Sequence, residues 1–143
     1  MKNQFVSYEL SVKLKELGFD EPCLAVYGYT MTDFEKEFRE RLVYHEEISL
    51  TEGRRMDFDD LKNSAIGFDI AAPLYQQVFD WFRETHNAYT DITRFYGNNI
   101  DLPGYRYNIK YDSSVSLSSH VYKEYHEVRE KCIEHLINFT ENK

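Results

Sequence analysis

Apolar side chains recur at helical spacing in three stretches of the chain, and the first of these covers residues 7–18. The one-sided apolar positions of this stretch follow an i, i+4, i+7 spacing and are Leu10, Leu14 and Leu17. Ser7 is a suitable N-cap, and Gly18 can adopt the left-handed conformation of the residue that follows a helix. We therefore expect a helix that ends at Gly18, with Phe19 packed back against Leu14.

The second stretch, residues 71–86, is the clearest helix in the sequence. Pro73 stands where the first helical residue is expected, because proline has no N–H to lose at that position. The stretch also holds the only tryptophan of the chain, Trp81. Its apolar positions form one broad face, and they are Leu74, Tyr75, Val78, Phe79, Trp81 and Phe82. This pattern indicates a core helix and no particular chemistry.

The third stretch predicts a long C-terminal helix that is capped by Ser118 or Ser119. The positions that share its apolar face are Val121, Tyr125, Val128, Cys132, Leu136 and Phe139. Their spacing favours a helix that lies across a sheet over a sustained coiled coil.

Two segments in the C-terminal half of the chain predict strands. Residues 105–111 alternate tyrosine or isoleucine with polar residues, which is typical of a half-buried strand. Residues 89–96 are rich in β-forming residues, and glycine and proline lie between the two segments. We expect the two strands to pair as an antiparallel hairpin. A further buried strand is expected from Cys23 through Tyr27 to Tyr29.

Residues 31–64 form a charged insert whose structure the sequence does not define. Thr32 and Glu35 make a capping box for a short helix that would extend to Leu42. Alternatively, Leu42 to Tyr44 belong with Ile48 and Leu50 to a second strand. The remainder, from residue 51 to 63, is polar and is expected to be an exposed loop.

These elements predict an α+β fold without regular βαβ alternation. The expected architecture is a small three- or four-stranded, mostly antiparallel sheet covered by helices, with a long C-terminal helix. The 143 residues, of which 42% are apolar, suffice for a single domain over residues 1–143.

Composition restricts the partners that the chain is expected to have. Aspartate and glutamate number 25 against 17 lysines and arginines, which gives a net charge of −8 and argues against nucleic acid. No apolar run has the length of a membrane span, and the N-terminus has no signal-peptide core. Cys23 and Cys132 lie far apart and are expected to be reduced and buried, in a cytoplasmic protein. The 12 tyrosines are more than a core requires, so some of them are available for a protein-binding surface, where tyrosine is enriched.

Three segments together resemble a known group of proteins: residues 14–23, residues 72–84 and residues 122–136. The group consists of small uncharacterised proteins that are encoded by gut anaerobes and by their phages and mobile elements. The resemblance implies a cytoplasmic, phage-related accessory protein. It implies no activity and no functional residues, and the charged insert at residues 31–64 has no counterpart in it.

A search for catalytic and cofactor motifs finds none. The chain contains no phosphate-binding glycine loop, no dinucleotide fingerprint, no nucleophile elbow and no metal motif built on its five histidines. His86 suits the negative end of the helix on which it lies, and His126 and His135 are expected at the edge of the last helix. Cys132 lies on an apolar face, which argues against a reactive thiol. The sequence therefore predicts no cofactor, no metal site and no catalytic residue.

One set of residues is a candidate binding surface, a basic strip on the hairpin formed by Arg94, Arg106 and Lys110. Basic side chains near tyrosines can bind a phosphate backbone or an acidic partner, and they can equally keep an exposed sheet face in solution. Three function classes stay open. The first is a non-enzymatic accessory protein that binds an unidentified protein or itself. The alternative is a nucleic-acid accessory factor that uses the strip, or an acidic decoy for a DNA-binding protein. An enzyme without a recognisable motif is the third and weakest hypothesis.

Overall fold

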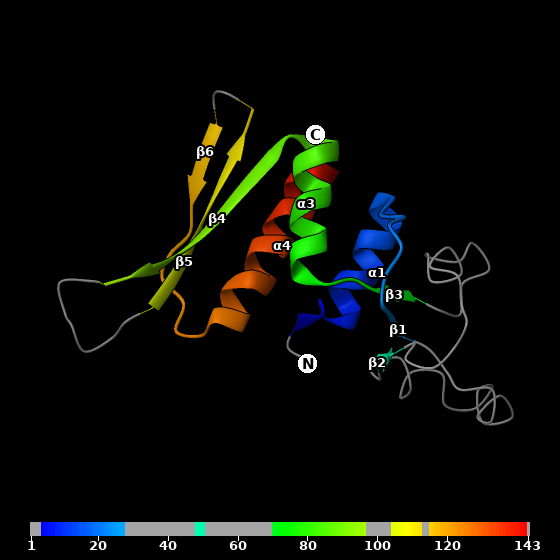
Figure 1. The fold of residues 1–143 in the computed structure, drawn as a ribbon. Helices are drawn as coiled ribbons and strands as arrows, with labels where there is room; N and C mark the ends of the chain where they lie inside the picture. Colours follow the sequence, from blue (N-terminus) through cyan, green and yellow to red (C-terminus); the bar gives the residue numbers. More distant parts are fainter. Residues whose placement is uncertain (1–3, 28–47, 51–69, 97–103, 113–114, 143) are drawn as a thin grey trace, which may run out of the picture. The chain divides into compact units, whose positions relative to one another are not determined.

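The computed structural model describes residues 4–27, 48–50, 70–96, 104–112 and 115–142, and the chain divides into two compact units, residues 1–74 and residues 75–143. The elements follow in the order α1 (Tyr8–Leu17), β1 (Ala25–Tyr27), β2 (Ile48–Leu50), β3 (Ile70–Ala72), α3 (Tyr75–His86), β4 (Ala88–Phe95), β5 (Gly104–Tyr111), β6 (Val115–Ser118) and α4 (Tyr125–Glu141) (Figure 1). Helices and antiparallel strands confirm the α+β class. The described strands form two three-stranded sheets, one in each unit.

The first unit consists of α1 and a sheet with the strand order β2-β1-β3. Both neighbours of β1 are antiparallel to it, and Ala25 lies opposite Leu50 on one side and Ala72 on the other. The chain before α1 joins this unit because the Val6 N–H donates to the Pro73 carbonyl at 2.9 Å. The Tyr27 hydroxyl donates to the Val6 carbonyl at 2.6 Å, which satisfies a polar atom in the core.

Helix α1 ends as the sequence predicts. Gly18 adopts a φ of 101°, which only glycine reaches without strain. Its N–H bonds the Lys15 carbonyl at 3.1 Å, and the Phe19 N–H bonds the Leu14 carbonyl at 2.9 Å. This pair of bonds is a Schellman motif, and both Phe19 and Leu14 are buried. Ser7 occupies the N-cap position as expected, with no side-chain cap hydrogen bond.

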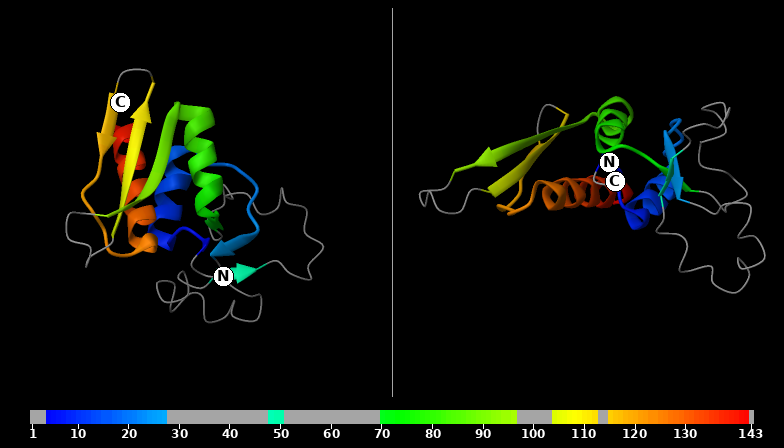
Figure 2. Two further views of the ribbon diagram at one scale, coloured as in Figure 1. Left: turned by 60° about the vertical axis from the view of Figure 1, so that its left-hand side comes forward. Right: turned by 60° about the horizontal axis from the view of Figure 1, so that its bottom comes forward.

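The second unit places helices α3 and α4 against a sheet with the order β4-β5-β6 (Figure 2). The predicted hairpin is confirmed, since β4 pairs antiparallel with β5 from Ala88 opposite Tyr111 to Phe95 opposite Gly104. Helix α4 packs mainly on β5. The buried apolar residues of its face are Val128, Cys132, Ile133, Leu136 and Ile137, and they meet the inward side chains Tyr107, Ile109 and Tyr111.

Two predicted helix starts are wrong. The second helix begins at Tyr75 instead of Pro73, because the Pro73 carbonyl accepts the Val6 N–H and Leu74 bridges to Phe5 in extended geometry. The last helix begins at Tyr125, and residues 115–118 form strand β6 on β5. Residues 119–124 then connect β6 to α4, and within them Tyr122 bridges to Tyr105.

Most of the charged insert lies outside the described residues, including the short helix expected from Thr32 to Leu42 and the loop at residues 51–63. The described part, Ile48–Leu50, is a strand. This agrees with the alternative that assigned Ile48 and Leu50 to a strand. Likewise, β1 covers Ala25–Tyr27 of the strand expected at residues 23–29, and residues 28 and 29 lie outside the described part.

Candidate functional site

One candidate binding feature in the described part of residues 75–143 is the edge of strand β4. In the strand order β4-β5-β6, one side of β4 pairs with β5, and no described strand pairs with the other side. An edge strand presents unpaired backbone N–H and C=O groups, which are a template for another strand. With eight residues, β4 is long for an edge strand.

The hydrogen bonds of β5 show which residues of β4 point to the free edge. Tyr105 exchanges two bonds of 2.7 Å with Tyr122, and Tyr107 accepts the Ser119 N–H at 2.9 Å, so these residues of β5 direct their backbone groups away from β4. Backbone direction alternates along a strand, so Gly104, Arg106, Asn108 and Lys110 face β4. The register then assigns Tyr89, Asp91, Thr93 and Phe95 to the ladder with β5. The backbone groups of Thr90, Ile92 and Arg94 consequently point outward.

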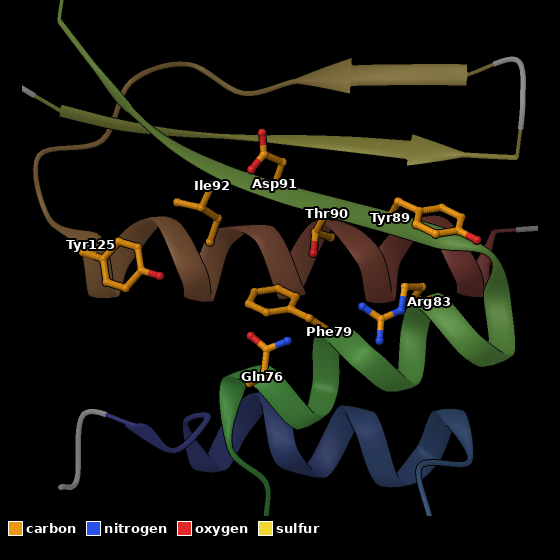
Figure 3. Close-up of a pocket in the computed structure, with 8 residues that line it drawn as sticks. All are labelled: Gln76, Phe79, Arg83, Tyr89, Thr90, Asp91, Ile92 and Tyr125. Carbon is orange, nitrogen blue, oxygen red and sulfur yellow. The ribbon is translucent and has the colours of Figure 1, made fainter.

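A pocket of about 220 Å³ lies beside this outward edge. Helix α3 contributes Gln76, Phe79 and Arg83, β4 contributes residues 89–92, and α4 contributes Tyr125. In Figure 3 the three α3 side chains project toward β4, and Thr90 and Ile92 project back toward α3. Arg83 is held by Asp80 on its own helix at 2.9 Å. We call this space, from Tyr89 to Tyr125, the β4 groove.

Buried aromatic and cationic groups fix the Tyr125 wall of the groove. Arg129 is only 7% exposed, and its guanidinium carbon lies 4.1 Å from the ring centroid of Tyr75 and 4.8 Å from that of Tyr125. Cation–π contacts of this kind strengthen when they are removed from water. Tyr105 of β5 adds an edge-to-face contact with Tyr125 at 5.3 Å. These contacts therefore hold the Tyr125 ring in place at one side of the groove, although the residue is 47% exposed.

The same cluster contains titratable side chains that lie within hydrogen-bond distance of one another. The Tyr75 hydroxyl donates to the Glu130 carboxylate and lies 3.3 Å from Nδ1 of His126. Because Tyr75 is 2% exposed, its hydroxyl cannot meet a substrate without local opening. We interpret these contacts as structural, since buried polar groups need hydrogen-bond partners.

A second group of titratable side chains lies between β5 and α4. The Tyr107 hydroxyl is 3.1 Å from Nδ1 of His135, and burial raises the pKa of the Tyr107 hydroxyl above its ordinary value. Burial also raises the pKa of the Cys132 thiol, which is fully buried. A neutral, inaccessible thiol is a poor nucleophile. Cys132 is thus a core residue, as its position on the apolar face predicts.

The three predicted basic residues do not share one face. Arg106 and Lys110 lie with Asn108 on the face of the sheet opposite to Tyr107 and Ile109. Arg94 lies opposite Tyr105 in the register and so projects from the other face, toward the helices. Two arginines stack on neighbouring rings. The Arg106 guanidinium lies 5.0 Å from the Phe95 ring centroid, and that of Arg94 lies 5.1 Å from the Tyr96 centroid.

Comparison with known proteins assigns no relative to this chain, because no family model, no curated protein and no solved structure matches it. Among the described residues, no group of three or more His, Cys, Asp or Glu side chains could hold a metal ion. The described helices also include none with the length and apolar character that crossing a membrane requires.

Sequence reasoning did not find the β4 groove. Phe79 shares helical spacing with the core residues Tyr75 and Phe82, and that spacing alone assigns it to the core. In the structure Phe79 is partly buried and lines the groove. Its position depends on where β4 returns past α3, which no local pattern records.

Proposed function

We propose that residues 75–143 form a protein-association module that binds an extended protein segment along the outward edge of β4. The observation that carries the proposal is the outward direction of the backbone groups of Thr90, Ile92 and Arg94, beside a pocket. An added strand would pair with these groups, and its alternate side chains would enter the groove at Phe79. This is strand addition, in which backbone bonds supply affinity and a pocket supplies specificity.

The lining of the groove supports this proposal. Phe79, Tyr125 and Ile92 supply apolar and aromatic contact area. The Gln76 amide nitrogen donates to Asp80 at 3.0 Å, and its amide oxygen can accept a hydrogen bond from a backbone N–H. Arg83, the charged side chain that α3 contributes, is engaged by Asp80.

A proline exchange on each edge of the sheet tests the proposal. Ile92→Pro removes an N–H that points outward from β4, and Ser116→Pro removes one that points outward from the opposite edge, at β6. We expect affinity-tagged wild type and Ser116→Pro to retain the same proteins from a lysate, untagged copies of this chain included. Ile92→Pro should lose them. Equal retention by all three proteins would contradict the proposal.

A nucleic-acid role is the second candidate, and the two stacked arginines favour it. Tyr96 is 67% exposed and Phe95 is 37% exposed, and each carries an arginine against its ring. Exposed rings beside cations are the features with which proteins bind single strands. The acidic excess lies mainly outside this unit, since residues 75–143 hold eight lysines and arginines against ten aspartates and glutamates.

Reversing the charge of the sheet face tests this second role. We expect binding of a fluorescent single-stranded oligonucleotide to fall steeply with salt and to be lost in Arg106→Glu/Lys110→Glu. Lys123→Glu, another exposed charge reversal in the same unit, is the control and should bind almost as the wild type does. Absence of binding by the wild type at low salt would exclude this candidate and leave the strand-addition proposal unaffected.

A further inference from the structure

The β4 edge is self-complementary, and this property points to one occupant for the β4 groove. We propose that β4 of a second copy of this chain fills the groove, antiparallel about a two-fold axis at Ile92, so that two three-stranded sheets join into one. This inference rests on the proposed strand addition and specifies its partner.

The possible registers can be compared one by one, because a two-fold axis perpendicular to the sheet must pair some residue with its own copy. An axis at Asp91 opposes two aspartates, and an axis at Arg94 opposes two arginines, which is unfavourable in both cases. With an axis at Thr90 or Thr93, several residues at one end of β4 have no partner residue in β4 of the second copy. Only the axis at Ile92 uses the strand from Tyr89 to Phe95 without opposing like charges.

The Ile92 register also matches the direction of the backbone groups. It pairs Thr90 with Arg94 of the second copy, Ile92 with itself, and Arg94 with Thr90 of the second copy. These are the residues whose N–H and C=O groups point outward. Each such pair exchanges two hydrogen bonds in an antiparallel ladder, so every outward group between Thr90 and Arg94 finds a partner.

On the face of the sheet away from the helices, the register brings exposed aromatic rings together. Tyr89 is 51% exposed and Phe95 is 37% exposed, and each ring would lie opposite the other residue's ring in the second copy. The pair occurs twice because of the symmetry, and aromatic cross-strand pairs are stabilising. Asp91 would lie opposite Thr93 of the second copy.

On the face toward the helices, the second copy would complete the groove. Arg94 projects from this face, and in the proposed register it lies opposite Thr90, which lines the pocket with Phe79. The guanidinium of the second copy would thus reach the Phe79 ring, where a cation is attracted by the aromatic face. The other cation of the pocket, Arg83, is already paired with Asp80. Each groove therefore receives a second arginine, from the other copy, beside the Phe79 ring.

Mass measurement of the purified full chain gives the first test. We expect native mass spectrometry and light scattering across a concentration series to show a species of twice 17.1 kDa. Ser116→Pro should remain dimeric, and Ile92→Pro should be monomeric. A wild type that is monomeric at every concentration would overturn the inference, as would equal loss of the dimer in both variants.

Charge changes at Thr93 test the register and do not depend on a proline variant folding. Thr93→Lys places two Lys–Asp91 pairs across the interface and should tighten dimerisation by about tenfold, whereas Thr93→Asp should weaken it by a similar factor. Within one chain Thr93 lies opposite Arg106, so the effect on monomer stability has the reverse sign. If Thr93→Lys weakened the dimer and Thr93→Asp strengthened it, as their effects on monomer stability would suggest, the register would be contradicted.

Cross-linking supplies an independent measurement of the register. Asp91→Cys/Thr93→Cys places two cysteines opposite each other at a pair that exchanges no backbone bonds, at a Cα separation that suits a disulfide. We expect rapid covalent dimers from the double variant and none from Asp91→Cys alone. Cross-linking by Asp91→Cys alone would move the axis to Asp91 and refute the proposal. Because these experiments use the protein alone, their failure would leave strand addition by a different protein to be judged by the capture experiment.

Discussion

A proline scan of β4 gives the sharpest prediction on stability, because the ladder with β5 distinguishes neighbouring residues. Thr93 belongs to the residues whose backbone groups bond β5, opposite Arg106, and Ile92 points outward. We therefore expect Thr93→Pro to destabilise the sheet much more than Ile92→Pro. For the same reason, Asp91→Pro should destabilise the sheet more than Thr90→Pro.

The expected magnitudes follow from the groups that each variant removes. Thr93→Pro deletes one ladder bond, worth about 1 kcal/mol, and leaves a carbonyl of β5 without its donor, which costs about 1–3 kcal/mol. Its total is about 2–4 kcal/mol. Ile92→Pro deletes no ladder bond and loses one side-chain carbon from a partly buried position, at roughly 0.8 kcal/mol per buried CH₂. The two variants should therefore differ by about 2 kcal/mol.

Fluorescence of the single tryptophan provides the assay, since Trp81 is buried in the same unit as β4. With a urea dependence of about 2 kcal/mol/M, the midpoint of Thr93→Pro should lie about 1 M below that of Ile92→Pro. The comparison is made at a protein concentration where further dilution no longer shifts the midpoints. Equal midpoints, or a lower midpoint for Ile92→Pro, would refute the assignment of the free edge.

Three further predictions concern the packing of the same unit. Gly104→Ala should lower stability by about 1–3 kcal/mol in the fluorescence assay, because a Cβ at this position would lie 2.7 Å from the Tyr122 carbonyl oxygen. Cys132 should resist alkylation in the native protein and react fully in urea, and fast native alkylation would contradict its burial. Burial raises the pKa of Tyr107 and Tyr111, so the stability that they contribute is complete below pH 10 and should fall as the pH rises above 10; replacing both by phenylalanine should reduce this fall.

Local signals in the sequence account for the elements that were predicted correctly. The end of α1 depends on Gly18 and on hydrogen bonds within five residues, so the sequence alone predicts where this helix ends. The β4–β5 hairpin follows in the same way from the alternation at residues 105–111 and from the breakers before it. In both cases the interacting groups are near neighbours along the chain.

Errors occurred where a distant partner determined the local structure. Ser118 and Ser119 are suitable helix caps, yet residues 115–118 form β6 because Leu117 and Ser118 pair with β5. Pro73 fits a helix start, yet its carbonyl bonds Val6, more than sixty residues earlier in the chain. Secondary-structure propensities are weaker than these tertiary contacts and are overridden by them.

By itself, the sequence determined the α+β class, the helix that ends at Gly18, the core face around Trp81 and the alternation of β5. Only the tertiary structure decided that β4 lies at an edge, that Thr90, Ile92 and Arg94 direct their backbone groups outward, and that Phe79 lines a groove. The physical reason is that a side-chain pattern records which residues avoid water, whereas strand order and hydrogen-bond direction depend on which distant segment each backbone meets.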